Sequence, residues 1–584
     1  MFSSRYFFYL YQTTKPRQCS MSYKVFKPQE YPLPYIIDDV SQWPIAKLTS
    51  DSDAFTAGVQ KAVVDKVKSR IKDDASLKSE LEKVLYQERI RLTGTPWKAD
   101  PKDERQFWNN IKSKIVRLDS TNTGEVHTSE EDILNEIVNR YTQEIVGHFD
   151  VSAFKFAKNI LPIFFGRILN AAPGKWFKTL SANAKTIHEK IPITGDVDRI
   201  RNLAKKGTII VVPTHFSNMD SIMVGWVLNE LGLPAFTYGA GLNLFSIKLL
   251  SYFMSNLGAY KVDRRKKNAV YLETLKTYSR EAIERGAHSI FFPGGTRSRS
   301  GALERKLKLG LLGTAVEAQK NNFKRFSDAT APKIYVVPLI INYHFVLEAE
   351  SLINDYLKET GKEKFIKEND HYSTSFGMVK FIFKFLSASS SLAISFGNPM
   401  DVIGNEVDEN GDSYNHLGQS INIKNYFMNN GELTDDHQRE EEYTKMLGEK
   451  IVSQYFKHNV VLTSHLVCFC AFELLRKKYN YIDIFTLIRI PEEDVRIGEQ
   501  ELIDAIERVK EQLKDMNKNN EVLISPEVRF TNEKVIEHGI SNISLYHANS
   551  PLARSSDGYY YSEDLKLLYY YHNRLEGYKL ERYV

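Results

Sequence analysis

The chain has 584 residues, of which 42% are hydrophobic and 26% are charged, and its formal net charge is +5. This length and composition indicate several folded domains and exclude wholesale disorder. The charge is too small to indicate nucleic acid as a partner, so we expect none. Three cysteines provide neither a disulfide framework nor zinc-ligand spacing, which favours a reducing compartment. We expect no metal and no cofactor.

Residues 1–50 are predicted to be an N-terminal extension or leader. Residues 1–29 contain no acidic residue, several aromatic ones and a few basic ones, as in a weak transit-like leader. The same segment fits an upstream extension of a chain whose translation starts at Met21 rather than Met1, and both interpretations stay open. Further along the chain, polar residues interrupt every apolar stretch before it reaches the about 20 residues of a membrane-spanning helix.

A largely helical region is predicted for residues 51–175. The helical pattern runs from Phe55 to about Leu118 and is broken at Thr93–Pro101, where a glycine and two prolines occur. A second helical block extends from Ser129 to about Ala172.

An α/β layered domain is predicted for residues 176–400, with a mixed central sheet between flanking regions that are largely helical. Short apolar runs separated by helical patterns carry this prediction. The predicted strands are Ile209–Val212, Ser289–Phe292, Ile334–Leu339 and Leu392–Phe396. Residues 401–440 are acidic and rich in Asn, Gly and Asp, which predicts a surface insertion. Residues 441–584 are predicted to be largely helical, with a Tyr-rich helix at Ser562–Tyr578.

The residues after the first of these strands indicate a catalytic base. His215 follows Pro213, where the strand is expected to end, and Asp220 lies five residues further on. Ligands bind beyond the carboxyl ends of the strands in open α/β sheets. A carboxylate beside a histidine there fixes the tautomer of the imidazole and stabilises its protonated form, as a general base requires.

The spacing of this pair is weak evidence by itself, because the composition predicts about two such pairs by chance. His127 and Asp132 form another one. Thr128 and Glu131 have capping-box spacing around it, so we interpret that pair as a solvated helix N-terminus.

The α/β region contains four short sequence blocks, at 214–220, 257–265, 291–301 and 336–343. The third block, at 291–301, has the chemistry of a phosphate site. Gly294 and Gly295 follow a predicted strand and allow the backbone to approach a ligand closely. Arg297 and Arg299 come next and can hold a phosphate through charge-assisted hydrogen bonds. The alternative is a solvated basic loop, since three further basic residues follow.

The four blocks together resemble the glycerolipid acyltransferase family, which contains glycerol-3-phosphate and lysophosphatidate acyltransferases. That family has His-x4-Asp, a Gly-x-Phe-x-x-x-Arg type of block, Phe-Pro-Glu-Gly-Thr-Arg-Ser and a Val-Pro block, in this order. The corresponding blocks here are Thr214–Asp220, Leu257–Arg265, Phe291–Gly301 and Val336–Tyr343. Outside them, the long helical flanks and three short segments resemble the membrane-type bacterial glycerol-3-phosphate acyltransferases. These segments are Glu144–Phe149, Asn459–Val467 and Leu568–Asn573.

The resemblance implies an activity and a set of site residues. The activity is transfer of a fatty acyl chain from acyl-CoA or acyl carrier protein to the sn-1 hydroxyl of glycerol 3-phosphate, in phospholipid biosynthesis. In the family the hydroxyl attacks the thioester directly, without an acyl-enzyme, and His215 and Asp220 would form the base. Substrate binding is expected of Arg264, Arg265, Gly294, Gly295, Thr296, Arg297, Arg299 and Pro338.

One position departs from the family pattern, because Gly294 stands where the family usually has Glu. This puts the acceptor contact of that Glu in doubt. A catalytically silent lipid-binding homologue therefore stays open as an alternative. Among enzymes, dihydroxyacetone phosphate and lysophosphatidate also stay open as acceptors.

Three apolar segments predict peripheral attachment to a membrane surface, on its cytoplasmic side and without a span. They are Ala153–Leu169, Leu242–Leu257 and Gly377–Leu386. Packing in the core or around an acyl-chain tunnel is the alternative. His465 also lies in an apolar run, and we expect it to be a hydrogen-bonded core histidine.

Overall fold

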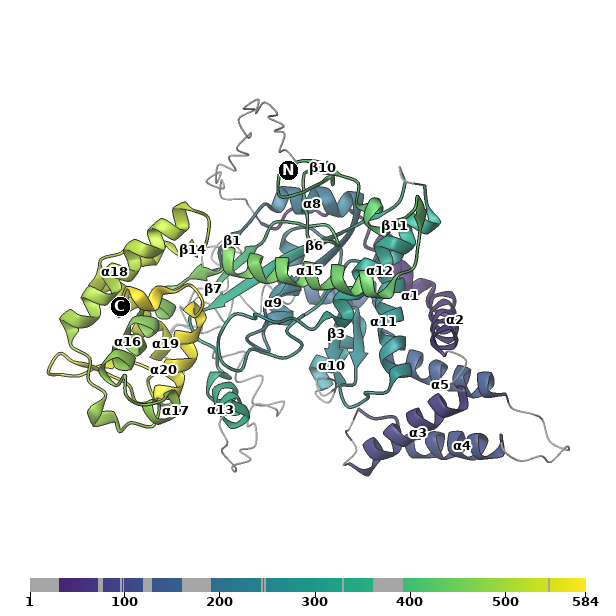
Figure 1. Cartoon of the computed structure of the whole chain (residues 1–584), viewed down its shortest axis with the longest axis horizontal. Coiled ribbons are helices and arrows are strands. Elements are labelled where there is room, and N and C mark those ends of the chain that lie inside the picture. Colours follow the sequence, from purple (N-terminus) through teal and green to yellow (C-terminus); the bar gives the residue numbers. More distant parts are fainter. Residues whose placement is uncertain are drawn as a thin grey trace, which may run out of the picture.

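The computed structural model describes residues 31–71, 77–94, 97, 99–118, 129–159, 191–242, 245, 248–327, 330–360, 392–544 and 547–584 (Figure 1). The predictions for residues 1–30, for His127 and for Gly377–Leu386 lie outside these ranges, as does the part of Ala153–Leu169 after residue 159.

A seven-stranded mixed sheet forms the centre of the molecule, in the order β1-β7-β6-β2-β5-β3-β4. β7 runs antiparallel to β6, and all other neighbours are parallel. The strands are β1 Ile193–Thr194, β2 Gly207–Pro213, β3 Thr237–Gly241, β4 Ala259–Val262, β5 Ser289–Ile290, β6 Lys333–Tyr343 and β7 Leu392–Phe396. The predicted α/β class with a mixed sheet is therefore confirmed, and the four predicted strands correspond to β2, β5, β6 and β7.

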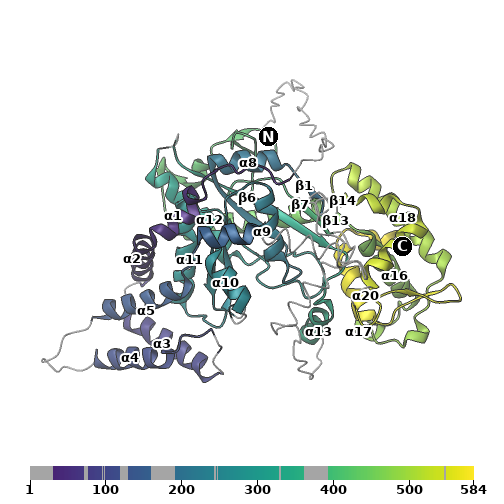
Figure 2. The ribbon, with the colours of Figure 1, turned by 180° about the vertical axis from the view of Figure 1, so that it is seen from behind.

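Successive side chains of β2 point to opposite faces of the sheet, and both faces are covered by helices. Ile209 and Val211 join a core cluster with α8 (Val197–Lys206) and α9 (Asp220–Glu230). Ile210 and Val212 join another cluster, which α11, α12 and α15 complete. These helices are Ala269–Glu284, Leu309–Arg325 and His437–Lys457. Figure 1 shows α12 and α15 in front of the sheet, and Figure 2 shows α8 and α9 from the opposite side. β2 is thus fixed from both faces, and the loop that follows it starts from a rigid point.

Contacts of Ser52–Arg70 and Glu130–Ile145 with α11 place the N-terminal helices beside one edge of the sheet (Figure 1). They are α1 Pro44–Ser50, α2 Ser52–Arg70, α3 Leu77–Thr93, α4 Glu104–Arg117 and α5 Glu130–Ile145. The predicted break in the helical pattern lies between α3 and α4. The predicted capping box is shifted by one residue, because Ser129 caps α5 and its partner is Asp132. Residues 151–159 are again helical.

The C-terminal helices surround α16 (Thr463–Lys478), which contacts α18, α19 and α20. These three are Glu499–Lys518, Asn532–Ser544 and Leu565–His572. The predicted Tyr-rich helix is therefore shorter than expected, since α20 ends at His572. His465 is buried in α16, and its Nε2 lies 3.0 Å from the carbonyl oxygen of Tyr343, as expected for a core histidine.

Residues 401–440 contain short strands and also contribute to the core. The strands are β8 Glu406–Val407, β9 Ser413–Tyr414, β10 Ser420–Ile421, β11 Met428–Asn429 and β12 Glu432–Leu433. Ile423 and Phe427 join the core cluster of α12 and α15, whereas most of the charged side chains of this segment are exposed or half-buried. The division of the chain into domains stays a prediction.

Candidate active site

The loop after β2 brings His215 and Asp220 together. The His215 Nδ1 atom lies 2.8 Å from Asp220 Oδ2, and Asp220 is fully buried at the first position of α9. The Oδ2 atom also accepts hydrogen bonds from the backbone N–H groups of Phe216 and Ser217, and Oδ1 accepts one from the Tyr343 hydroxyl. Because these bonds fix the carboxylate, it holds the proton of the imidazole on Nδ1. The Nε2 atom is then left to accept a proton from a ligand.

The backbone of His215 is tied to the third sequence block. The Ser298 N–H donates to the His215 carbonyl oxygen at 2.7 Å, and the His215 N–H donates to Glu304 Oε1 at 2.9 Å. The imidazole packs against the ring of Phe292, with 4.6 Å between the ring centroids. The side chain of His215 remains 18% exposed, so a ligand can reach it.

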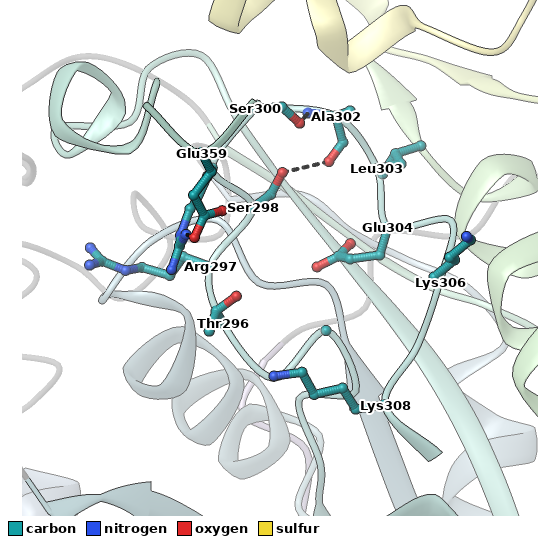
Figure 3. A pocket seen from close by; sticks show the side chains of 12 residues that line it. Thr296, Arg297, Ser298, Ser300, Ala302, Leu303, Glu304, Lys306, Lys308 and Glu359 are labelled. Carbon is teal, nitrogen blue, oxygen red and sulfur yellow. Dashed lines mark hydrogen bonds and ion pairs between the residues drawn. The ribbon is translucent and has the colours of Figure 1, made fainter. Parts of the chain in front are cut away.

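The third block forms the wall of a cavity of about 410 Å³ (Figure 3). The lining residues are Gly294, Thr296, Arg297, Ser298, Arg299, Ser300, Ala302, Leu303, Glu304, Lys306, Lys308 and Glu359. Four of them are cationic and two are acidic. The imidazole of His215 does not line this cavity, but its backbone adjoins the cavity through Ser298 and Glu304.

Arg297 is held in place by a buried acid. One Nη atom of Arg297 lies 3.2 Å from Glu348 Oε1, which also accepts the backbone N–H of Asn218. Burial raises the pKa of Glu348, while the positive charge of Arg297 opposes that rise. An arginine carries five N–H donors, so Arg297 keeps donors for a ligand after it has bound Glu348.

Arg264 lies close enough to Arg297 to be affected by its charge. Burial and the positive charge of Arg297 lower the pKa of Arg264. The Arg264 side chain forms no hydrogen bond or ion pair with any other residue that the structure describes. Two neighbouring guanidinium groups repel each other, and an anion between them removes that repulsion. Arg299 is less available, because it forms an ion pair with Glu359 at the rim of the cavity.

Four of the eight residues expected to bind substrate do not line the cavity, namely Arg264, Gly295, Arg265 and Pro338, and the last two have other roles. Arg265 forms ion pairs with Asp263 and Asp100, and its guanidinium carbon lies 4.0 Å from the centroid of the Trp97 ring. Arg265 therefore ties β4 to the N-terminal helical region and does not line the cavity. Pro338 is buried within β6 opposite Val212 and does not line it either.

Replacement of Arg265 by alanine is expected to lower stability rather than substrate affinity. The change removes a partly exposed double ion pair and the stacking on Trp97, worth about 1–2 kcal/mol in the free energy of unfolding. Urea unfolding measures that loss, and the KM for a phosphorylated acceptor should stay within about twofold of the parent value. A tenfold rise in that KM at unchanged stability would instead assign Arg265 to the acceptor.

The structure adds residues that the sequence alone did not reveal. Glu304 and Glu348 are single acidic residues beyond the ends of sequence blocks, and Tyr343 is the last residue of the fourth block. Arg574 comes from the C-terminal region, and its guanidinium carbon lies 3.4 Å from the centroid of the Phe216 ring. Burial lowers the pKa of Arg574 to about 10.

The C-terminal segment also contacts the cavity wall directly. The Asn573 side-chain amide donates to the carbonyl oxygen of Ser300 at 2.9 Å. Gly301 has φ +83° and packs so closely on Tyr570 that an added Cβ would lie 2.1 Å from the Tyr570 carbonyl oxygen. A sequence signal for these contacts is absent, because more than 250 residues separate the two segments.

In the described ranges, no cluster of three or more His, Cys, Asp or Glu side chains could hold a metal ion. Cys468 and Cys470 are buried in α16, and burial raises the pKa of both thiols. None of the described helices is both long enough and apolar enough to span a bilayer.

Comparison with known proteins supports the sequence resemblance. Residues 196–342 match the family model described as Acyltransferase, and this range includes β2, His215, Asp220 and the loop 291–301. The chain is 31% identical over 207 residues to the glycerol-3-phosphate acyltransferase of Actinobacillus pleuropneumoniae serotype 5b (strain L20). The aligned residues cover 35% of this chain and 23% of the relative.

Two further relatives carry the same name, glycerol-3-phosphate acyltransferase. The protein of Hamiltonella defensa subsp. Acyrthosiphon pisum is 33% identical over 176 residues, 30% of this chain and 20% of its own length. That of Alteromonas mediterranea is 26% identical over 265 residues, 45% of this chain and 29% of its own length. The matched part of the chain therefore spans less than a third of each of these three relatives.

Proposed function

We propose that this protein transfers a fatty acyl chain from a thioester, acyl-CoA or acyl carrier protein, to the 1-hydroxyl of glycerol 3-phosphate. The observation that carries the proposal is the pairing of two features. His215 has its Nδ1 bound to a buried carboxylate, and a cationic cavity with Arg297 adjoins the same loop. An acceptor that carries both a hydroxyl and a phosphate needs a base for the first and fixed cations for the second. The name of the relatives is consistent with that acceptor.

In the proposed reaction the acceptor hydroxyl attacks the thioester carbonyl directly. The Nε2 atom of His215 takes the hydroxyl proton as the new C–O bond forms. Asp220 then faces the imidazolium and stabilises its charge. When the tetrahedral intermediate collapses, the C–S bond breaks and the imidazolium returns the proton to the leaving thiolate. The buried thiols of Cys468 and Cys470 lie in α16 and have no part in this scheme.

A panel of acceptors tests this function. Purified full-length protein and a radiolabelled acyl-CoA would be incubated with glycerol 3-phosphate, dihydroxyacetone phosphate, lysophosphatidate or glycerol. We expect the highest kcat/KM with glycerol 3-phosphate and little product with glycerol, which lacks the phosphate. A clear preference for another phosphorylated acceptor would correct the substrate, and the absence of transfer to every acceptor would favour a silent lipid-binding homologue.

We also propose peripheral contact with the cytoplasmic face of a membrane, through aromatic side chains on two adjacent helical segments. Phe156 is 52% exposed on the segment 151–159, and Tyr252 is 51% exposed on α10 (Lys248–Asn256). The rings of Phe156 and Phe253 stack with centroids 6.4 Å apart, so the two segments present one surface. Lys155, which is next to Phe156 in the sequence, is also exposed. Exposed aromatic side chains with basic residues nearby are typical of interfacial binding.

Substitution of both Phe156 and Tyr252 by alanine should weaken binding to anionic vesicles by about tenfold or more. Burial of each ring in the interface contributes about 1.5–3 kcal/mol, whereas salt screens only the lysine part. Sedimentation with vesicles, at low and high salt, measures the effect. If the parent protein does not sediment with vesicles at either salt concentration, these rings have another role.

A further inference from the structure

The glycine at residue 294 is explained by a side chain that reaches the same space from another part of the loop. An ideal Cβ on Gly294 would lie 3.1 Å from Glu304 Oε1 and 3.2 Å from Glu304 Cγ. Gly294 does not have a positive φ, unlike Gly295 with φ +73°, so its backbone would accept another residue. A side chain at residue 294 would therefore be crowded by Glu304, whereas the backbone conformation of the turn would allow it.

The carboxylate of Glu304 has one satisfied oxygen and one free oxygen. Oε1 accepts the backbone N–H of His215, whereas Oε2 is inaccessible to solvent and has no hydrogen-bond partner in the described part of the chain. A buried polar atom without a partner is rare, and it indicates a ligand or a bound water. Figure 3 shows the carboxylate directed inward, toward the space between Thr296 and Ser298.

We propose that Glu304 supplies the site carboxylate that this chain lacks at residue 294, and that it binds the non-reacting 2-hydroxyl of the acceptor. This inference rests on the proposed acylation of glycerol 3-phosphate. The phosphate is assigned to Arg297 and Arg264, and the reacting hydroxyl to His215. Glu304 Oε1 accepts a hydrogen bond from the backbone of the base, and Glu304 lines the same cavity as Arg297. A hydroxyl can donate or accept, and a carboxyl group in either protonation state can satisfy it.

Comparison of two acceptors isolates this contact. Glycerol 3-phosphate has the 2-hydroxyl, and 3-hydroxypropyl phosphate lacks it but is otherwise the same. Glu304→Ala is expected to raise the KM for glycerol 3-phosphate by about tenfold and to change the KM for 3-hydroxypropyl phosphate less than about twofold. The kcat should fall similarly with both acceptors, because the His215 N–H loses its partner in either case.

A reciprocal exchange separates the proposed role from a structural one. Gly294→Glu alone should impair activity, since its side chain meets Glu304. The double variant Gly294→Glu/Glu304→Ala returns a carboxylate to the same space and should restore the KM for glycerol 3-phosphate to within about threefold of the parent. Glu304→Gln, which keeps the size of the side chain and an oxygen for the His215 N–H, should lie between the parent and Glu304→Ala. Glu576→Ala, an exposed partner of Arg305, is the matched control and should resemble the parent.

Two results would overturn the inference while the proposed function stands. One is an equal rise in KM for both acceptors in Glu304→Ala, and the other is a double variant no better than Glu304→Ala. A parent protein that transfers acyl groups to neither acceptor would instead overturn the proposed function. Thermal unfolding of each variant shows that the comparison is made between folded proteins.

Discussion

His215→Ala is expected to lower kcat for acyl transfer by roughly 10²–10⁴-fold, the usual contribution of a positioned general base. The imidazole is the group whose Nε2 can take the hydroxyl proton, and its orientation depends on a buried carboxylate with three further hydrogen bonds. The KM for both substrates should change little, because the imidazole acts mainly in the transition state. Initial rates at saturating substrates measure the effect.

Two other histidines serve as controls for this substitution. His127→Ala removes the other His-x4-Asp pair of the sequence and should leave turnover unchanged. His437→Ala removes an exposed histidine at the start of α15, whose Nδ1 lies 3.4 Å from Glu441 Oε1. This variant should also leave turnover unchanged. Similar losses in all three variants would show that the pairing of His215 with Asp220 has no special role.

Arg297→Ala is expected to raise the KM for glycerol 3-phosphate by roughly ten- to a hundredfold and to leave the KM for the acyl donor near the parent value. A phosphate monoester is close to doubly charged at neutral pH, and each hydrogen bond to a charged group contributes on the order of 1.5–3 kcal/mol. The guanidinium is already oriented by Glu348, so little freedom is lost on binding.

The substitution also leaves the buried carboxylate of Glu348 without its cation, so stability must be measured beside KM. Arg297→Lys keeps a positive charge near Glu348 but loses the planar fork, and it should restore stability more than it restores KM. If the KM for the acyl donor rose instead, the cavity would hold the phosphates of the donor, and our assignment of the two substrates would be reversed.

The strands that sequence patterns revealed are those with continuous apolar runs. β2 and β6 consist almost wholly of buried apolar residues, as central parallel strands do. β3 was missed because Thr237–Gly241 contains two glycines and no β-branched run, and β4 was missed because a lysine interrupts the apolar residues of Ala259–Val262. Their positions depend on pairing with β5 and with each other, which local sequence does not express.

The candidate site divides in the same way. His215 and Asp220 were predictable because both lie in one short loop, where their spacing is visible. The sequence could not show which of Arg264 and Arg265 is available to a ligand. The two arginines are adjacent, and only the fold determines which of them lies near carboxylates. Arg574 reaches Phe216 only through the packing of the C-terminal helices, and no local sequence pattern indicates that contact.

An experimental structure of the protein with bound glycerol 3-phosphate would test the proposed reaction most directly. We expect the phosphate within hydrogen-bond distance of Arg297 and Arg264, and the 1-hydroxyl about 3 Å from His215 Nε2, the reach required of a general base. A phosphate bound away from Arg297, or a 1-hydroxyl that cannot reach the imidazole, would contradict the proposed reaction.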